Sequence, residues 1–138
     1  MAIAHRSNAS AVVILIDADD DCPAELGPSL LSRSKEVLGV IPVSVVCAKF
    51  EFESWFLGSQ KSLRGVRGLK AHVEDVVYAE SVRNAKGFLS RNMIDHRTYL
   101  PVDDQPALAS EFDIEVARRN CPSLDKFIRD IGMLVNRL

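Results

Sequence analysis

The chain has 138 residues and a formal net charge of −2, with 47% hydrophobic and 26% charged residues. This length fits one domain with a real hydrophobic core, so we treat residues 1–138 as a single domain. The near-neutral charge excludes a global attraction to nucleic acid or to an anionic membrane, and any such binding must come from a local patch. No apolar run reaches the roughly 18 residues that span a bilayer, which predicts a protein without a membrane partner.

Three cysteines, Cys22, Cys47 and Cys121, are scattered along the chain without CxxC spacing. This pattern favours reduced thiols over a disulfide framework or a zinc site. The first ten residues hold one Arg and no long apolar stretch, unlike a secretory signal. We therefore expect a cytoplasmic protein.

Two short apolar runs predict strands that are buried on both faces, as in a parallel sheet. They are residues 11–17 (AVVILID) and 41–48 (IPVSVVCA). Leucines and valines recur at helical spacing across residues 23–39, and we expect Gly27 and Pro28 to break this helix into a short turn and a longer body. A strand–helix–strand unit with one short crossover predicts a parallel, right-handed pair.

An aromatic cluster is expected directly after the second strand. Phe52, Trp55 and Phe56 stand at i, i+3 and i+4, which places their side chains on one face of a helix. Because the three rings share that face, we interpret Trp55 as a core residue rather than a stacking platform. Residues 60–70 (QKSLRGVRGLK) are predicted as a basic loop interrupted by glycines.

The C-terminal half is predicted to be mostly helical. We expect a helix over residues 80–93, an extended or looped stretch at 97–106, and another helix that starts at Pro106. Residues 123–138 (SLDKFIRDIGMLVNRL) place their apolar side chains on one helical stripe, with Ser123 as the N-terminal cap.

The fold class that these elements predict is α/β. It is a small, mainly parallel, Rossmann-like sheet with flanking helices. Only two strands are convincing, with residues 72–78 and 97–102 as weak candidates for a third. A two-stranded sheet rarely holds a domain together, so a second copy of the chain or a further segment is expected to complete it.

Four aspartates end the first predicted strand: Asp17, Asp19, Asp20 and Asp21. If the strand stays extended, the first, second and fourth of them face one side, at the carboxyl edge where open α/β sheets place their ligands. Glu53 follows the second strand and would face them across that edge. Converging carboxylate oxygens suit Mg²⁺ or Mn²⁺. We therefore predict a metal site with Asp17, Asp19, Asp21 and Glu53 as ligands.

Simpler interpretations of these acidic residues stay open. Asp20 and Asp21 stand where a carboxylate often caps a helix, and capping or solvation is the better explanation for Asp20. Glu53 could be no more than the partner of Lys49 at i, i+4 on an exposed helix face.

An aspartyl-phosphate mechanism is a lower-ranked alternative, in which a carboxylate forms an acyl phosphate. It would begin with Asp17 and Asp19, and its later lysine and acidic pair would be Lys86 and Asp103 with Asp104. These later residues are not clearly at strand ends.

Basic residues recur at every third position in the predicted loop. They are Lys61, Arg64, Arg67 and Lys70, and Lys86 adds basic charge on the helix that follows. Such residues can track a phosphate backbone through contacts that are salt-sensitive and independent of sequence. We predict them as nucleic-acid contacts, with a solvated surface loop as the simpler alternative.

Four linked stretches resemble one family. VVILIDADDDCPAELGPSLL, VVCAKFEFESWFLGSQKSLRGVRGL, AKGFLSRNM and YLPVDDQPAL with FDIEVARRNCPSLDKF are similar to an uncharacterised bacterial family, domain of unknown function 4276, which is regarded as related to Toprim domains. The resemblance implies a Toprim-like fold in which a DxD pair and a glutamate bind Mg²⁺ for phosphodiester chemistry. The DxD pair corresponds to Asp17 and Asp19, and Glu51, Glu53 and Trp55 match the family's acidic–aromatic motif.

The resemblance also implies a departure from the family pattern. Members usually begin with a strand–helix–strand region that carries the Toprim glutamate, whereas residues 1–10 contain no Glu. We therefore expect the chain to lack the N-terminal part of the fold.

Two functions follow as expectations. The first is a Mg²⁺- or Mn²⁺-dependent phosphodiesterase or nuclease in which Lys49 and Glu53 are catalytic, with Lys49 stabilising phosphate charge. The second is a non-catalytic interaction module that acts as a subunit of a larger assembly. Its partner would be an ATPase, or a second copy of the chain that completes the sheet.

Overall fold

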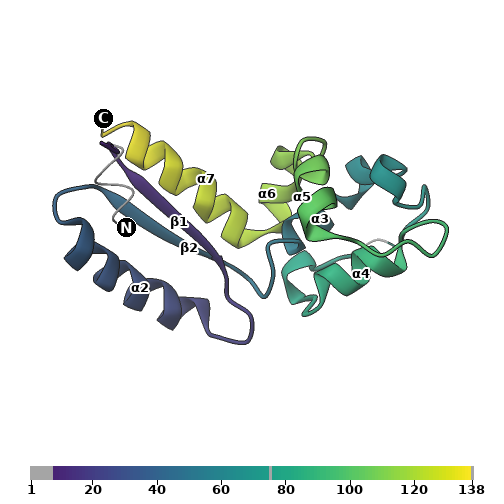
Figure 1. Cartoon of the computed structure of the whole chain (residues 1–138), viewed down its shortest axis with the longest axis horizontal. Helices are drawn as coiled ribbons and strands as arrows, with labels where there is room; N and C mark the ends of the chain where they lie inside the picture. The colour runs from purple at the N-terminus through teal and green to yellow at the C-terminus, as the bar shows by residue number, and fades with distance from the viewer. Residues whose placement is uncertain (1–7, 75, 138) are drawn as a thin grey trace.

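The computed structural model describes residues 8–74 and 76–137 (Figure 1). Strand β1 (Val12–Asp17) and strand β2 (Val43–Ala48) form a two-stranded parallel sheet, so their carboxyl ends lie at the same edge. Helix α2 (Pro23–Leu38) makes the crossover between them. The predicted α/β class and the parallel strand pair are confirmed.

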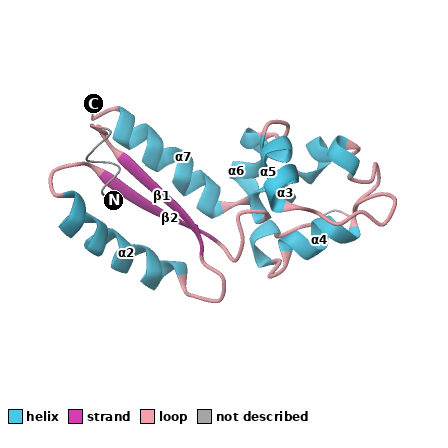
Figure 2. Cartoon of the chain, in the orientation of Figure 1, coloured by secondary structure: helices cyan, strands magenta, loops and turns pink. Residues whose placement is uncertain are grey.

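The rest of the described chain is helical or irregular, as Figure 2 shows. In Figure 1 the strands lie with α2 and α7 at one end of an elongated molecule, and the shorter helices gather at the other end. The remaining elements are α3 (Ser54–Gly58), α4 (Ala85–Arg91), α5 (Pro101–Ala109), α6 (Ile114–Asn120) and α7 (Pro122–Val135), with 3-10 turns η1 (Gln60–Leu63), η2 (Val66–Gly68) and η3 (Ala79–Ser81).

The sheet lies between α2 and α7 (Figure 1). Because side chains alternate along a strand, neighbouring residues of β2 face opposite sides. Val45 and Cys47 pack with leucines of α2. Ala48 instead belongs to a larger apolar core that includes Leu124 and Phe127 of α7. Residues 45–48 of β2 are buried, as expected for a continuous apolar run. No residue of β1 is buried and Val13 is 37% exposed, so the prediction of a strand buried on both faces is confirmed for β2 and wrong for β1.

The three rings of the predicted aromatic cluster pack together, although Phe52 lies in the turn before α3 and not on the helix. The ring of Phe52 lies 4.9 Å from that of Trp55 and 5.4 Å from that of Phe56, measured between centroids. Trp55, only 2% exposed, also packs against Phe127 of α7 at 5.4 Å. Its Nε1 donates a hydrogen bond of 2.8 Å to Oγ of Ser123. Trp55 is therefore a core residue, as expected.

Prolines do not interrupt helices where the sequence suggested. Helix α2 continues through Pro28, and α5 begins at Pro101 and contains Pro106, so the predicted break and the predicted start at Pro106 are wrong. A helical proline leaves the carbonyl four residues earlier without its donor. Those carbonyls belong to Ala24 and Val102, two exposed residues at which water can replace the missing bond.

Two further expectations need correction. Helix α7 begins at Pro122, and Ser123 uses its hydroxyl to contact Trp55 and Glu80 instead of capping the helix. The helix predicted over residues 80–93 is shorter, since α4 starts after Asn84, whose side chain accepts a hydrogen bond as a cap.

Two negative findings complete the fold. The part of the chain that the structure describes forms no third strand at either weak candidate segment; residue 75, within the first of them, lies outside it. Within residues 8–74 and 76–137, no helix combines the length and apolar character needed to cross a membrane.

Candidate functional site

Acidic side chains from both strand ends converge on one lysine. Asp17 is the last residue of β1, Glu51 and Glu53 follow β2, and Lys86 lies in the first turn of α4. The Nζ atom of Lys86 lies 3.5 Å from Oδ2 of Asp17, 3.5 Å from Oε1 of Glu51 and 3.5 Å from Oε2 of Glu53. One ammonium group therefore faces three carboxylates at the carboxyl edge of the sheet.

Backbone hydrogen bonds hold the segment after β2 against the end of β1. The N–H of Ala18 donates to the carbonyl of Ala48 at 2.9 Å, and that of Asp19 donates to the carbonyl of Phe50 at 2.9 Å. The side chain of Asp17 extends this pairing, because its Oδ1 accepts a bond of 2.7 Å from the N–H of Phe52. One oxygen of Asp17 is thus fixed by the backbone, and the other is directed to Lys86.

Glu53 is the most buried member of the site, with 0% of its surface exposed. Its Oε1 accepts hydrogen bonds from the hydroxyl of Tyr99 at 2.9 Å and from Nε2 of Gln105 at 3.0 Å. Its Oε2 has no hydrogen-bond partner among the described residues and faces only the ammonium of Lys86. Burying an acidic oxygen without a hydrogen bond is costly, which marks this atom as one that a cation would satisfy.

Glu51 connects the backbone and the side chain of the same lysine. Its Oε2 accepts a bond of 2.9 Å from the backbone N–H of Lys86, and its Oε1 faces Nζ. This contact places the start of α4 over the strand ends. The side chain of Lys86 is 37% exposed, so it reaches the carboxylates from the surface.

The charges of the site do not balance. Burial alone would lower the pKa of Lys86, but the negative charges of Glu53, Glu51 and Asp17 outweigh burial and raise that pKa. Lys86 therefore stays protonated at neutral pH. At formal charges, three carboxylates and one ammonium leave two negative charges uncompensated.

The donor set fits a hard divalent cation, although not in the arrangement observed. Mg²⁺ takes oxygen ligands at about 2.0–2.1 Å, well below the 3.5 Å that separates each carboxylate from Nζ of Lys86. In agreement, the described residues hold no group of three His, Cys, Asp or Glu side chains close enough to ligate one ion. Direct ligation would therefore require the lysine to leave and the carboxylates to approach.

The other predicted aspartates lie outside this cluster. Strand β1 ends at Asp17, and the chain then turns, with Asp19 at a φ of 47°, so the extended geometry that would align alternate aspartates is not formed. Asp19 and Asp21 are exposed. Asp20 forms an ion pair with Arg83 at the surface.

Lys49, the predicted catalytic lysine, is placed beside an aromatic ring. Its Nζ lies 4.4 Å from the centroid of the Phe50 ring. The lysine that contacts the carboxylates is Lys86, which the sequence had suggested as a nucleic-acid contact and as the lysine of the aspartyl-phosphate alternative. The exposed i, i+4 pairing of Lys49 with Glu53 is not formed, because Glu53 is buried.

The predicted basic loop forms one surface with a second segment. The N–H of Lys70 donates to the carbonyl of Asn92 at 2.8 Å, and that of Ile94 donates to the carbonyl of Gly68 at 2.8 Å. Nζ of Lys70 also donates to the carbonyl of Arg91 at 2.9 Å. This pairing defines the basic surface, residues 61–70 and 91–97, which carries exposed Lys61, Arg64, Arg67, Lys70 and Arg91 with half-buried Arg97.

Part of this surface is held by a buried carboxylate. Asp104, with a fully buried side chain, pairs with Arg97 and with Nε of Arg67 at 3.2 Å, and it accepts a bond of 2.8 Å from the N–H of Leu100. Asp104 is therefore committed to positioning two arginines. It is not placed with Asp17 and Lys86, as the aspartyl-phosphate alternative would need.

Sequence reasoning missed the residues that orient Glu53. Tyr99 and Gln105 lie 46 and 52 residues further along the chain. No local pattern connects either residue with the strand end. Glu51 was noted only as part of a family motif. Its position two residues before Glu53 was the signal that could have placed it in the carboxylate cluster.

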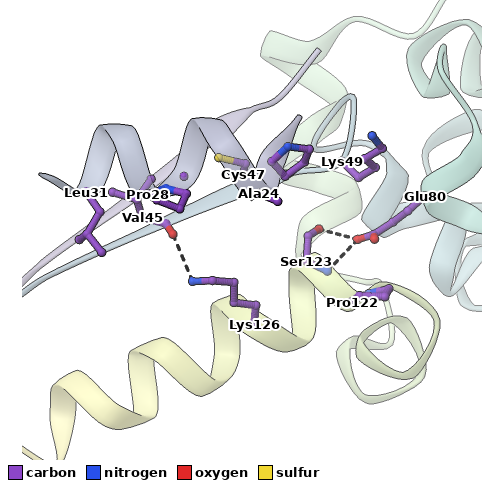
Figure 3. Close-up of a pocket in the computed structure, with 12 residues that line it drawn as sticks. Ala24, Pro28, Leu31, Val45, Cys47, Lys49, Glu80, Pro122, Ser123 and Lys126 are labelled. Atoms are coloured by element: carbon purple, nitrogen blue, oxygen red, sulfur yellow. Dashed lines mark hydrogen bonds between the residues drawn. The ribbon is translucent and has the colours of Figure 1, made fainter. Parts of the chain in front are cut away.

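A separate cavity of about 480 Å³ lies between α2, β2 and the start of α7 (Figure 3). Its lining is largely apolar, with Lys126 bridging to the carbonyl of Val45 at 3.2 Å. Figure 3 shows Ser123 and Glu80 joined at its other side, while Lys49 points away from the cavity. The carboxylates that surround Lys86 do not line it.

Comparisons with known proteins agree with the family resemblance. No curated protein and no solved structure matches the chain. A family model described as "Domain of unknown function (DUF4276)" matches residues 1–132. The chain therefore belongs to this family.

Proposed function

We propose that the protein is a Mg²⁺- or Mn²⁺-dependent phosphodiesterase that acts on nucleic acid through a Toprim-like site. The observation that carries this proposal is the convergence of Asp17, Glu51 and Glu53 around one point at the carboxyl edge of the sheet. The buried Oε2 of Glu53, which lacks a hydrogen bond among the described residues, supports a cation at that point.

The three carboxylates would hold the cation, with the exposed Asp19 and Asp21 at the rim of the site. A divalent cation so bound would activate water and neutralise charge that develops on the phosphate. The chain itself fixes the carboxylates, through Tyr99 and Gln105 on Glu53 and through the backbone on Asp17. This preorganisation is what a phosphoryl-transfer site requires of its protein.

The basic surface supports nucleic acid as the substrate. Helix α4 carries Lys86 in its first turn and Arg91 as its last residue, so the two lie roughly 8 Å apart along the helix axis. A phosphate backbone that crosses the basic surface could thus reach the carboxylates. Because the contacts are ionic, we expect weak sequence preference and strong salt dependence. The three cysteines are free, and we place this activity in the cytoplasm.

A plasmid-nicking assay with Mn²⁺ tests the proposal. Glu53→Gln and Asp17→Asn each keep the shape of the side chain and remove its charge, and we expect both to abolish nicking. Glu111→Gln and Asp103→Asn make the same changes at exposed positions and should keep wild-type activity. Nicking that persists in Glu53→Gln would show that the activity does not arise from this site.

The second candidate is a non-catalytic interaction module. The observation in its favour is that β1 pairs with only one neighbour in the described part of the chain, which leaves an edge for further strands. A second copy of the chain, or an ATPase to which it is a subunit, would then cover this edge. Sedimentation velocity at increasing protein concentration tests this second candidate. We expect a module of this kind to associate with itself as the concentration rises, and Glu53→Gln to leave that association unchanged.

A further inference from the structure

We propose that Lys86 is a built-in counter-ion that closes the carboxylate site, and that a divalent cation binds by displacing its ammonium group. The inference rests on the metal site of the proposed function and adds how access to that site is controlled. Four observations on the described residues carry it: the distances around Nζ, the uncompensated charge, the fixed carboxylates and the partial exposure of the lysine.

The distances show that the ammonium fills the site without binding tightly to any one carboxylate. Charge-assisted N–H···O bonds are about 2.7–2.9 Å long, whereas Nζ of Lys86 is 3.5 Å from its nearest oxygen on each of Asp17, Glu51 and Glu53. The lysine therefore contributes its charge to all three groups and a short hydrogen bond to none. Its departure breaks no strong directional contact of the side chain.

The charge of the site favours the exchange. Lys86 compensates one of three formal negative charges, and a divalent cation at the same point compensates two. The buried Oε2 of Glu53 gains most, because it has no other partner among the described residues. A small cation can also approach each oxygen more closely than an ammonium at 3.5 Å.

The site stays organised when the lysine leaves. Tyr99 and Gln105 hold Glu53, and the backbone N–H of Phe52 holds Asp17. The backbone N–H of Lys86 keeps its own bond of 2.9 Å to Glu51. The lysine side chain has to move out, and with 37% of it exposed it has a path to solvent. The oxygens that faced it then close on the smaller cation.

The affinity of the site for a cation therefore depends on the fraction of molecules in which the Lys86 side chain has left the carboxylates. Apparent affinity falls in proportion to the fraction of molecules in the competent state, so a lysine that occupies the site nine-tenths of the time weakens binding about tenfold. Removing the charge of Lys86 should therefore raise the apparent affinity for the cation about tenfold.

Titration calorimetry with MnCl₂ tests the inference on the full chain. Lys86→Met keeps most of the length of the side chain without its charge, and we expect it to bind Mn²⁺ about tenfold more tightly than the wild type. Lys35→Met, at an exposed position of α2, should bind like the wild type. Equal or weaker binding by Lys86→Met overturns the counter-ion role while leaving the metal site in place. Absence of Mn²⁺ binding in the wild type and in Lys86→Met overturns the metal site itself.

A second measurement uses the wild-type protein, and so does not depend on how well Lys86→Met folds. Reductive methylation of lysines is followed by mass spectrometry with and without Mn²⁺. We expect Mn²⁺ to accelerate modification of Lys86 several-fold and to leave Lys35 unchanged. An unchanged or slower rate at Lys86 would contradict displacement.

Discussion

The hydroxyl of Tyr99 donates a hydrogen bond of 2.9 Å to Oε1 of Glu53, and this contact leaves the second oxygen of the carboxylate for Lys86. Burial, and then the negative charge of Glu53, raise the pKa of Tyr99. The phenol therefore keeps its proton at neutral pH and remains a donor. A residue far along the chain thus orients the most buried group of the site.

Tyr99→Phe is expected to weaken this arrangement without removing it, because Gln105 still donates to Glu53. Loss of one hydrogen bond to a buried charge should lower the free energy of unfolding by about 1.5–3 kcal/mol. Urea denaturation measures this change. Tyr78→Phe makes the same change at a residue that is 74% exposed and should have little effect. Equal losses in the two variants would show that the Tyr99 contact contributes nothing specific.

A close approach at Gly58 gives a packing prediction. A Cβ at this position would lie 2.5 Å from Sγ of Cys121 and 3.2 Å from the carbonyl oxygen of Ala117. Gly58→Ala should therefore destabilise the protein by about 1–3 kcal/mol. Thermal unfolding followed by circular dichroism measures it.

Gly132 provides the matched control for this substitution. It lies inside α7, and a Cβ there would meet no atom within 4 Å. Gly132→Ala should stabilise the protein by up to about 1 kcal/mol, the difference in helix propensity. A stable Gly58→Ala variant would mean that α3 and α6 do not approach as closely as described.

The ionised side chain of Asp104 is expected to make the stability of the fold sensitive to acid. Burial alone would raise the pKa of Asp104, but bonds from the N–H of Leu100 and from Arg97 and Arg67 outweigh it and lower that pKa. A carboxylate with a lower pKa in the folded than in the unfolded chain stabilises the fold above the unfolded value, near 3.8. This stabilisation disappears as the pH falls from there through the folded pKa.

Asp104→Asn tests this assignment. At pH 7 the variant should be less stable by about 1.5–3 kcal/mol, and the difference from wild type should shrink as the pH drops below 3.8. Urea denaturation at a series of pH values measures it, with the exposed Asp95→Asn as the control. A difference that is constant with pH would rule out the ionised carboxylate as its source.

The sequence predicted one side of the candidate site better than the other. Two apolar runs indicated parallel strands, and parallel strands place their carboxyl ends together, so Asp17 and Glu53 were correctly brought to one edge. The alternation rule applies only while a strand continues. It could not place Asp19, because the chain turns directly after β1.

The other side of the site depends on long-range packing. Lys86 reaches the carboxylates because Glu51 accepts a hydrogen bond from its backbone, and that contact has no counterpart in local spacing. Tyr99 and Gln105 both come from residues 97–106, which were predicted as an extended or looped stretch, whereas Gln105 lies in α5. Which polar residue faces a buried carboxylate is decided by the packing of α4 and α5, and hydrophobic periodicity does not contain that information.

The most direct test of the proposed metal site is a calorimetric titration of the wild type and of Glu53→Gln with MnCl₂. We predict that the wild type binds one Mn²⁺ and that Glu53→Gln weakens binding about tenfold or more, because the most buried of the three carboxylates loses its charge. Glu111→Gln, which makes the same change at an exposed position outside the cluster, should change the affinity by less than about threefold. A wild type that binds no Mn²⁺, or a Glu53→Gln variant that binds as tightly as the wild type, would contradict the proposed metal site.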